Sequence, residues 1–400
     1  MKPQNKIDKW LFTLFALPLF VATLSTAAAN IFGVLFLITY VFSGYWHEWR
    51  QLLSRTWFWP LMALVAINFM GMLWTEDTAR GLQLLVKLKW VLYTLAGATL
   101  PWRREHFVLL VRLFLVGIAI NAVIGGLQWF NLYPWRVIEV GGGRIGYTNR
   151  IFFSMTLTCA LLWIAYDLKN KYVFSRLINS TLAAIFFVHL IFAGGRAGLL
   201  SFVLLFPMAL WLLYPGRWRV WAMIVVAVGV IGMGLSPQVQ KRMYEVVTDI
   251  RQYQAGNAET SIGFRLVFWE GALLMTREHP FLGVGTGDYT IEMDRLHQRR
   301  AIPDTPENPV TTHPHNSFLA YLANLGLIGL AIFVWFLWAA IKEAWKHKEH
   351  ATAWYKLSYM GIFVVGSLTD TLIWGVHNSI ALGLIVAIPY LLKSESEEVG

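Results

Sequence analysis

The chain has 400 residues, of which 57% are hydrophobic, 15% are aromatic and only 14% are charged. Soluble proteins carry about 25% charged residues, so this composition excludes an ordinary soluble domain. Apolar runs of about 17 to 25 residues, long enough to cross the hydrocarbon layer of a membrane, recur along the whole chain. We therefore predict an all-α polytopic membrane protein in which residues 1–400 form a single membrane domain.

The formal net charge of +10 does not indicate a nucleic-acid-binding protein, because the basic residues cluster in short segments between apolar runs. Such clusters determine membrane topology instead. The single cysteine, Cys159, lies within an apolar run. It therefore predicts neither a disulfide framework nor a thiolate metal site.

About twelve membrane-spanning helices are predicted, with bounds uncertain by a few residues. They cover residues 9–28, 30–45, 57–74, 81–100, 106–130, 150–167, 175–194, 197–214, 218–235, 316–341, 353–370 and 373–392. Short loops rich in lysine and arginine stay cytoplasmic, and their spacing here places both termini on that side. The first run, followed by STAAAN, also resembles a cleavable signal peptide, and cleavage would not change the orientation of the rest.

Two sizeable loops lie on the opposite, outer face in this topology, one near residues 131–150 and a larger one at residues 236–315. A connection of about 80 residues is too long for a simple turn and is expected to have its own structure. QVQKRMYEVVTDIRQYQ and GFRLVFWEGALLMTREH have helical patterns, and the three glycines of PFLGVGTGDY predict a tight turn. The chain is thus predicted to be one domain with an elaborated outer face.

Charged residues at the membrane edge of this face define the candidate site. Arg196 lies in the short turn FAGGRAGLLSF, and Arg265 lies on SIGFRLVFWEGA, whose apolar side fits the membrane interface. An arginine at the membrane edge by default marks a site with a partner, although snorkelling to lipid headgroups is the alternative. His313 and His315 of HPHNSF are candidates for a general base, for metal ligands or, with Asn316, for helix capping.

Three motifs in series, GGRAG, REHPFLGVGTGDY and HPHNSFLAYLANLGLIGL, resemble the O-antigen ligase family, which includes O-antigen polymerases and bacterial O-oligosaccharyltransferases. The resemblance extends from about the fifth span onward. It implies a GT-C-like, inverting, metal-independent glycosyltransferase of the bacterial inner membrane that needs no cofactor. The donor would be an undecaprenyl-diphosphate-linked glycan, and the acceptor a sugar hydroxyl of lipid A–core in lipopolysaccharide biosynthesis. The large loop and the active site would face the periplasm.

This chemistry assigns roles to the candidate residues. Arginine binds phosphate oxygens in bidentate fashion, so Arg196 and Arg265 are expected to bind the diphosphate. His315 matches the histidine–asparagine pair of the family and is the candidate general base. His313 and Asn316 are expected to support it or to contact substrate. A zinc site on the two histidines would lack a supporting cysteine or HExxH pattern, so no metal site is predicted.

Other basic residues are candidates for the site only because of their positions in the sequence. The family carries a basic residue near Arg242, which is therefore a candidate third diphosphate ligand. Lys87 and Lys89 either point into a lipid-diphosphate cavity or snorkel to headgroups. Arg144 and Arg150, in VGGGRIGYTNR, breach the positive-inside pattern. That breach indicates either a bound anion or glycan, or interfacial anchoring.

Two alternatives stay open. A non-enzymatic flippase or transporter of lipid-linked glycans also has about twelve spans, but it would place charges at mid-membrane within broken, repeated helices. Within the family, polymerases and protein O-oligosaccharyltransferases share the core motifs. Protein-modifying members usually carry a long soluble segment after the last span, whereas here KSESEEVG follows. This favours a ligase without excluding a polymerase.

Overall fold

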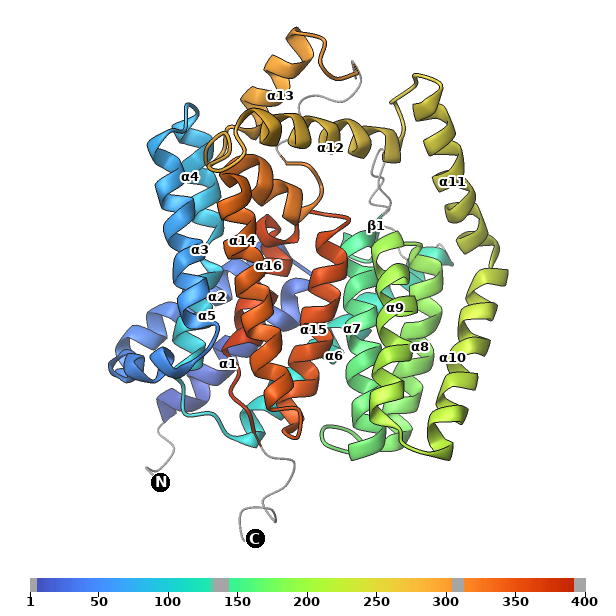
Figure 1. Ribbon diagram of the computed structural model, residues 1–400. Helices are drawn as coiled ribbons and strands as arrows, with labels where there is room; N and C mark the ends of the chain where they lie inside the picture. Colours follow the sequence, from blue (N-terminus) through green and yellow to red (C-terminus); the bar gives the residue numbers. More distant parts are fainter. Residues whose placement is uncertain (1–5, 131, 133–143, 304–312, 392–400) are drawn as a thin grey trace.

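The computed structural model describes residues 6–130, 132, 144–303 and 313–391, and this part of the chain is almost entirely helical (Figure 1). Each predicted span corresponds to helical structure. The corresponding elements are α1 (Lys6–Ala22), α2 (Thr26–Ser43), α3 (Phe58–Met70) with η2 (Gly71–Leu73), α4 (Thr78–Lys87) with α5 (Trp90–Ala98), α6 (Arg104–Trp129), α7 (Arg150–Asn170), α8 (Arg176–Ala193), α9 (Arg196–Leu213), α10 (Arg217–Leu235), α14 (Ser317–Lys346), α15 (Ala351–Ser367), and η3 (Leu372–Trp374) with α16 (Val376–Ala387).

Seven of the described helices, α2, α6 to α10 and α14, are long and apolar enough to cross a membrane. An eighth candidate is the pair formed by η1 (Tyr45–Ser54) and α3 with η2, which is bent by 103°. The predicted fourth span differs from expectation, because it breaks between α4 and α5 and α4 carries Arg80, Gln83 and Lys87. The structure nevertheless confirms an all-α polytopic membrane protein.

The remaining helices gather at one end of the bundle, which we call the loop face (Figure 1). They are α11 (Pro237–Gln254), α12 (Ser261–Glu278) and α13 (Tyr289–Gln298), and a short hairpin of β1 (Arg144–Ile145) and β2 (Thr148–Asn149) lies below them. The loops that join α7 to α8, α9 to α10 and α14 to α15 lie at the opposite end. Lys171, Arg217 and Lys348 lie in or beside these loops, and short basic loops are the pattern that the topology rule uses.

A second, smaller hydrophobic core holds α12 on the bundle. It includes Val267, Phe268, Met275, Tyr289 and Met293, from α12 and α13. The sequence predicted that the apolar side of α12 would lie on the membrane interface. That expectation is corrected for Phe268, which is only 4% exposed because it packs against protein instead.

The glycine-rich loop PFLGVGTGDY fastens this outer layer to α14. α14 is kinked at Gly326, where φ is 65° and ψ is −164°. The loop runs along this kink, and the Val284 N–H donates a 3.0 Å hydrogen bond to the Ala323 carbonyl. At Gly283, where φ is +67°, a Cβ atom would lie 2.4 Å from the backbone of Asn324. Only glycine fits so close to another backbone with a left-handed conformation.

Asp288 fastens the same loop to the start of α4. Its carboxylate accepts hydrogen bonds from the backbone N–H groups of Glu76 at 2.7 Å and Asp77 at 2.9 Å. The Thr286 hydroxyl also donates to the Asn68 carbonyl of α3 at 2.8 Å. The loop is therefore tied to two separate parts of the bundle, which fixes the position of α12 above it.

Replacing Gly283 by alanine should destabilise the protein more than the same change at Gly44, which ends α2. Both glycines have positive φ, but a Cβ at Gly44 meets nothing within 4 Å. The left-handed backbone costs about 1–2 kcal/mol in either variant, whereas only Gly283→Ala also disrupts loop docking. Thermal unfolding in detergent should give the lower midpoint for Gly283→Ala, and equal midpoints would contradict the docking role.

Candidate active site

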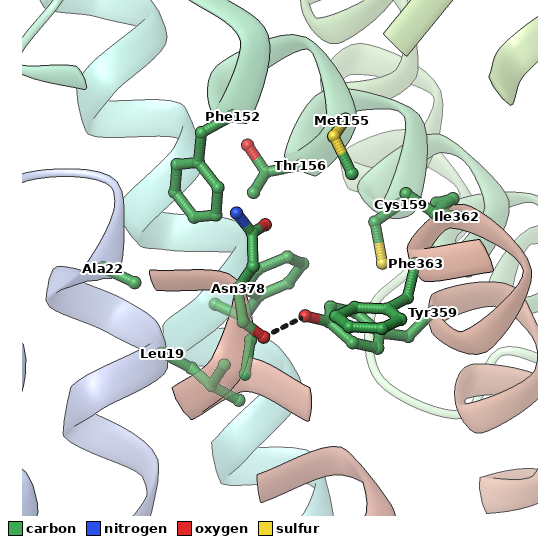
Figure 2. Close-up of a pocket in the computed structure, with 12 residues that line it drawn as sticks. Leu19, Ala22, Phe152, Met155, Thr156, Cys159, Tyr359, Ile362, Phe363 and Asn378 are labelled. Atoms are coloured by element: carbon green, nitrogen blue, oxygen red, sulfur yellow. Dashed lines mark hydrogen bonds between the residues drawn. The ribbon is translucent and has the colours of Figure 1, made fainter. Parts of the chain in front are cut away.

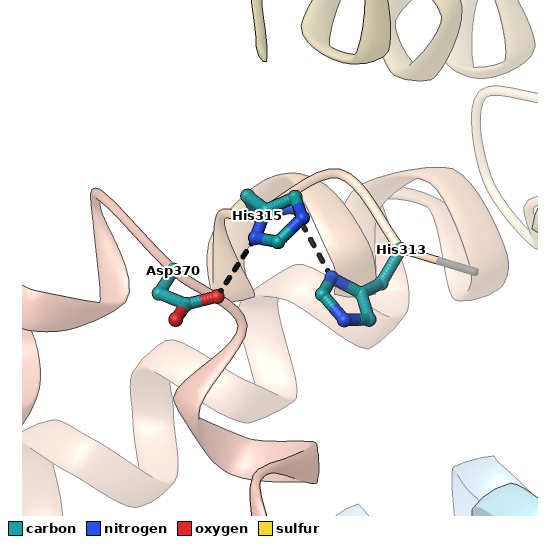
Figure 3. Close-up of side chains that lie close together, drawn as sticks. All are labelled: His313, His315 and Asp370. Atoms are coloured by element: carbon teal, nitrogen blue, oxygen red, sulfur yellow. Dashed lines mark hydrogen bonds and ion pairs between the residues drawn. The ribbon is translucent and has the colours of Figure 1, made fainter. Parts of the chain in front are cut away.

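His315 and Asp370 form a hydrogen-bonded pair on the loop face (Figure 3). His315 directly precedes the cap of α14, and Asp370 lies in the turn between α15 and η3. The His315 Nδ1 and the Asp370 Oδ1 are 3.0 Å apart. The backbone N–H of His315 donates a hydrogen bond to the His313 Nδ1 at 3.4 Å. His315 has a φ of +50°, which few non-glycine residues adopt. The two predicted histidines are thus neighbours, and an unpredicted carboxylate joins them.

Asn316 caps α14, as the sequence allowed. Its Oδ1 accepts hydrogen bonds from the N–H groups of Phe318 at 2.9 Å and Leu319 at 3.1 Å. Its own N–H donates to the Thr371 hydroxyl at 3.1 Å, which joins α14 to the turn that carries Asp370. Because Asn316 provides the cap, His315 is not needed for that role.

Three arginines meet where α7, α9 and α11 approach one another. Arg196, the first residue of α9, and Arg242, on α11, both donate to the Glu245 Oε2, at 3.2 and 2.8 Å. Arg150 is the first residue of α7 and interacts electrostatically with Arg196 and Arg242. The N-terminal ends of α7 and α9 add partial positive charge, so the position favours an anion.

The glycines around Arg196 bring these helices together. A Cβ atom at Gly195 would lie 2.7 Å from the carbonyl oxygen of Arg150, and one at Gly198 would lie 2.4 Å from the backbone of Ser154. The start of α9 therefore packs directly on the start of α7. The small residues of GGRAG position the two arginines side by side at the ends of their helices.

The charge of Arg265 acts on both the arginines and the histidine–aspartate pair. Arg265 projects from α12 and interacts electrostatically with both Arg196 and Asp370. Burial lowers the pKa of Arg265, Asp370 opposes this effect, and Arg196 adds to it. The guanidinium still stays charged at neutral pH. α12 is held over the site by the Trp269 indole, which donates to the Pro314 carbonyl at 2.9 Å.

Positive charge exceeds negative charge at this site. In the described part of the chain, one carboxylate, Glu245, bonds to the arginines. Burial opposes ionisation of Glu245, but the hydrogen bond and charge of Arg242 outweigh it and lower its pKa. Asp370 behaves alike, because the hydrogen bond and charge of His315 outweigh burial and lower the Asp370 pKa. Because four guanidinium groups lie near these two carboxylates, positive charge is left unbalanced and a further anion is favoured.

The other predicted residues have mixed placements. Lys87 ends α4 and, with Arg80, interacts electrostatically with His313, so it belongs to the same face. Lys89 is partly buried at the break between α4 and α5. The backbone of Arg144 belongs to the hairpin, but its side chain lies outside the described part of the structure.

His313, His315 and Asp370 can reach a common cation, because one ligand atom of each lies within 4.8 Å of the others. Two features disfavour a divalent ion there. The His315 Nδ1 is already hydrogen-bonded to Asp370, and the cations of Arg265 and Lys87 act on the same groups. The trio therefore fits a hydrogen-bonded acid–base group better than a metal centre.

An apolar cavity of about 20 Å³ lies elsewhere, in the bundle interior (Figure 2). Phe152, Met155, Cys159, Tyr359 and Asn378 are among its lining residues. Its volume is sufficient for about one water molecule. Since none of its lining side chains is charged at neutral pH, this cavity offers no site for an anionic substrate.

These features define an all-α integral membrane protein with an arginine-rich site and a histidine–aspartate pair on one face. Residues 181–334 match the family model described as O-antigen ligase, which confirms the family resemblance of the three motifs. An uncharacterized protein of Haemophilus influenzae is 26% identical over 113 residues, which cover 28% of this chain and 28% of that protein. Arg150 and Asp370 lie outside the family match. The sequence indicated an anion or interfacial anchoring for Arg150, and it gave no role to Asp370 or Glu245.

The His313 imidazole should make stability depend on pH. Burial lowers the pKa of His313 to about 4, and the charges of His315, Lys87 and Arg80 act in the same direction, against Asp370. The unfolded chain takes up this proton near pH 6.5, before the folded chain does, so stability falls as pH drops from about 6.5 to about 4.

His313→Gln should flatten this part of the stability curve. Unfolding midpoints of the variant and the wild type in detergent between pH 7 and pH 4 would measure the difference. If His313→Gln kept the pH dependence of the wild type, the pKa of His313 would be the same in the folded and the unfolded chain, which would contradict the prediction.

Proposed function

We propose that this chain is an O-antigen ligase, which transfers a glycan from undecaprenyl diphosphate to a sugar hydroxyl of lipid A–core. The observation that carries the proposal is the position of Arg265, which interacts with the His315–Asp370 pair through Asp370 and with the arginine cluster through Arg196. A group that can take a proton thus lies beside a group that can hold a diphosphate. The family match supports the same reaction class.

The arginines suit the leaving group. When the bond between the sugar and the diphosphate breaks, negative charge develops on the phosphate oxygens, and fixed cations stabilise it most when they need not rearrange. Arg196, Arg242 and Arg265 are the proposed ligands, and the electrostatic interaction of Arg150 with all three supports it as a fourth. Guanidinium groups bind such oxygens in bidentate fashion.

His315 suits the acceptor. If Asp370 accepts the Nδ1 hydrogen of His315, the Nε2 lone pair is available to take the proton of the acceptor hydroxyl. The hydroxyl oxygen then bonds to the anomeric carbon while the bond to the diphosphate breaks and its electrons leave with that group. A single displacement of this kind inverts the anomeric configuration. Asp370 stabilises the imidazolium that forms, as a carboxylate does in other histidine-based sites.

We infer the orientation from charge. Basic loops lie at the end opposite the loop face, and such loops stay cytoplasmic. The loop face, with residues 236–315, would then face the periplasm of an inner-membrane protein, with both termini in the cytoplasm. Donor and acceptor are lipid-anchored, so both can reach a site at the membrane edge.

Arg265→Ala should abolish transfer while the protein stays in the membrane, because the diphosphate loses a bidentate ligand. By analogy with a lost oxyanion donor, the rate should fall about 10²- to 10³-fold. Arg265→Lys should recover little, since a point charge lacks the guanidinium fork. The transfer rates of the purified variants measure this loss. The control is Arg277→Ala, which changes an exposed arginine on the same helix. Near-normal activity in Arg265→Ala would contradict the assignment.

His315→Asn should fold normally and lose transfer. Asparagine tolerates the positive φ of this position but cannot act as a base. General-base catalysis contributes about 10²- to 10⁴-fold, so residual turnover should stay measurable. Donor binding should persist, and His313→Ala should lose much less activity. A well-folded, fully active His315→Asn would make His315 a structural residue.

Transfer should survive exhaustive chelation. Arginines supply the positive charge that a divalent ion provides in many glycosyltransferases, and Asp249, Glu270 and Asp288 each accept a hydrogen bond from another protein group. Purified protein treated with EDTA should therefore keep its rate. Loss of activity that Mg²⁺, Mn²⁺ or Zn²⁺ restores would mean that His313, His315 and Asp370 hold a required ion.

A further inference from the structure

Glu245 occupies the guanidinium groups that the proposed function assigns to the diphosphate. Its Oε2 accepts hydrogen bonds from the Arg196 Nη2 at 3.2 Å and from the Arg242 Nη1 at 2.8 Å. Carboxylate and phosphate oxygens are both anionic acceptors for the same guanidinium hydrogens. The carboxylate and a diphosphate therefore compete for these two arginines.

The helix that carries Glu245 is lightly held. Of the residues of α11, Val239 is the one that is buried, and α11 lies at the edge of the molecule (Figure 1). Glu245 itself is 30% exposed, and Arg242 is 28% exposed. The carboxylate can thus leave the arginines by side-chain rotation or a small movement of α11, without disturbing the core of the bundle.

Charge also explains why a competitor would be useful. Breaking the sugar–diphosphate bond leaves one additional negative charge on the diphosphate. The product lipid therefore binds fixed guanidinium groups more tightly than the donor does. Tight product binding slows turnover when release limits the rate. An anion within the protein that rebinds the same arginines lowers this barrier.

We propose that Glu245 is an internal competitor for the diphosphate, which holds Arg196 and Arg242 between reactions and helps to displace the undecaprenyl diphosphate product. This inference rests on the proposed function for its role in turnover. Its alternative is a permanent ion pair in which Glu245 only positions the two arginines. The two roles predict opposite effects of removing the charge on the affinity for a diphosphate.

Inorganic pyrophosphate binding to the purified protein tests the competition without any transfer reaction. Glu245→Gln should bind pyrophosphate roughly fivefold more tightly, as expected when partly exposed ion pairs no longer compete. Glu245→Asp, which keeps the charge, should stay near wild type. The control Glu259→Gln removes the same charge from an exposed position between α11 and α12 and should change little.

Isothermal titration calorimetry gives these affinities, with thermal midpoints to establish that each variant is folded. Unchanged or weaker binding by Glu245→Gln would overturn the competitor role, and weaker binding would mean that Glu245 positions the arginines. No binding by the wild type would also overturn it, because the arginines would then not form a diphosphate site.

Turnover tests the role in release. Glu245→Gln should transfer at least as fast as wild type in a single turnover, but more slowly over many turnovers, with a burst followed by a slower phase. Equal loss in both regimes would contradict a release role. Glu245→Gln could bind pyrophosphate more tightly than the wild type although the wild type transfers no glycan. The proposed function would then be wrong, but the competition between Glu245 and a diphosphate would be confirmed.

Discussion

Guanidinium charge at the edge of an apolar helix bundle needs an anion, and this need organises the loop face. Arg150 and Arg196 begin α7 and α9, where the helix ends are already positive. Glycines allow these ends to approach closely, so the charges cannot spread apart. Glu245 offsets part of the charge in the described structure, and Arg265 extends it toward Asp370. A diphosphate fits this arrangement because it brings several anionic oxygens at once.

The helices of the outer layer differ in how firmly they are packed. α12 is held by a hydrophobic core, by the Trp269 bond to Pro314 and by the glycine-rich loop in the kink of α14. The backbone at Arg265 is therefore held in place, which favours electrostatic preorganisation. α11 has little buried surface, which suits a side chain that must leave and return. The same segment of chain thus supplies one firmly packed part and one lightly packed part of the proposed site.

Much of this arrangement was predictable from local patterns. The apolar runs predicted the helices within a few residues, and the motifs contain three residues of the proposed site, Arg196, Arg265 and His315. Asp370 was missed because its turn between two apolar runs has no motif, and its role depends on the fold bringing α15 beside α14. Glu245 lies three residues after Arg242, but its second bond, to Arg196, joins residues 49 positions apart. Hydropathy also could not reveal that Phe268 of α12 packs on protein.

The most direct measurement is the lipopolysaccharide of a strain that lacks this chain, with its lipid-linked glycans extracted in parallel. A ligase predicts loss of the long lipopolysaccharide ladder together with accumulation of full-length glycan on undecaprenyl diphosphate, both restored by the wild-type chain. A single repeat still attached to the core would instead identify a polymerase. An unchanged ladder without accumulated donor would contradict a role in lipopolysaccharide assembly altogether.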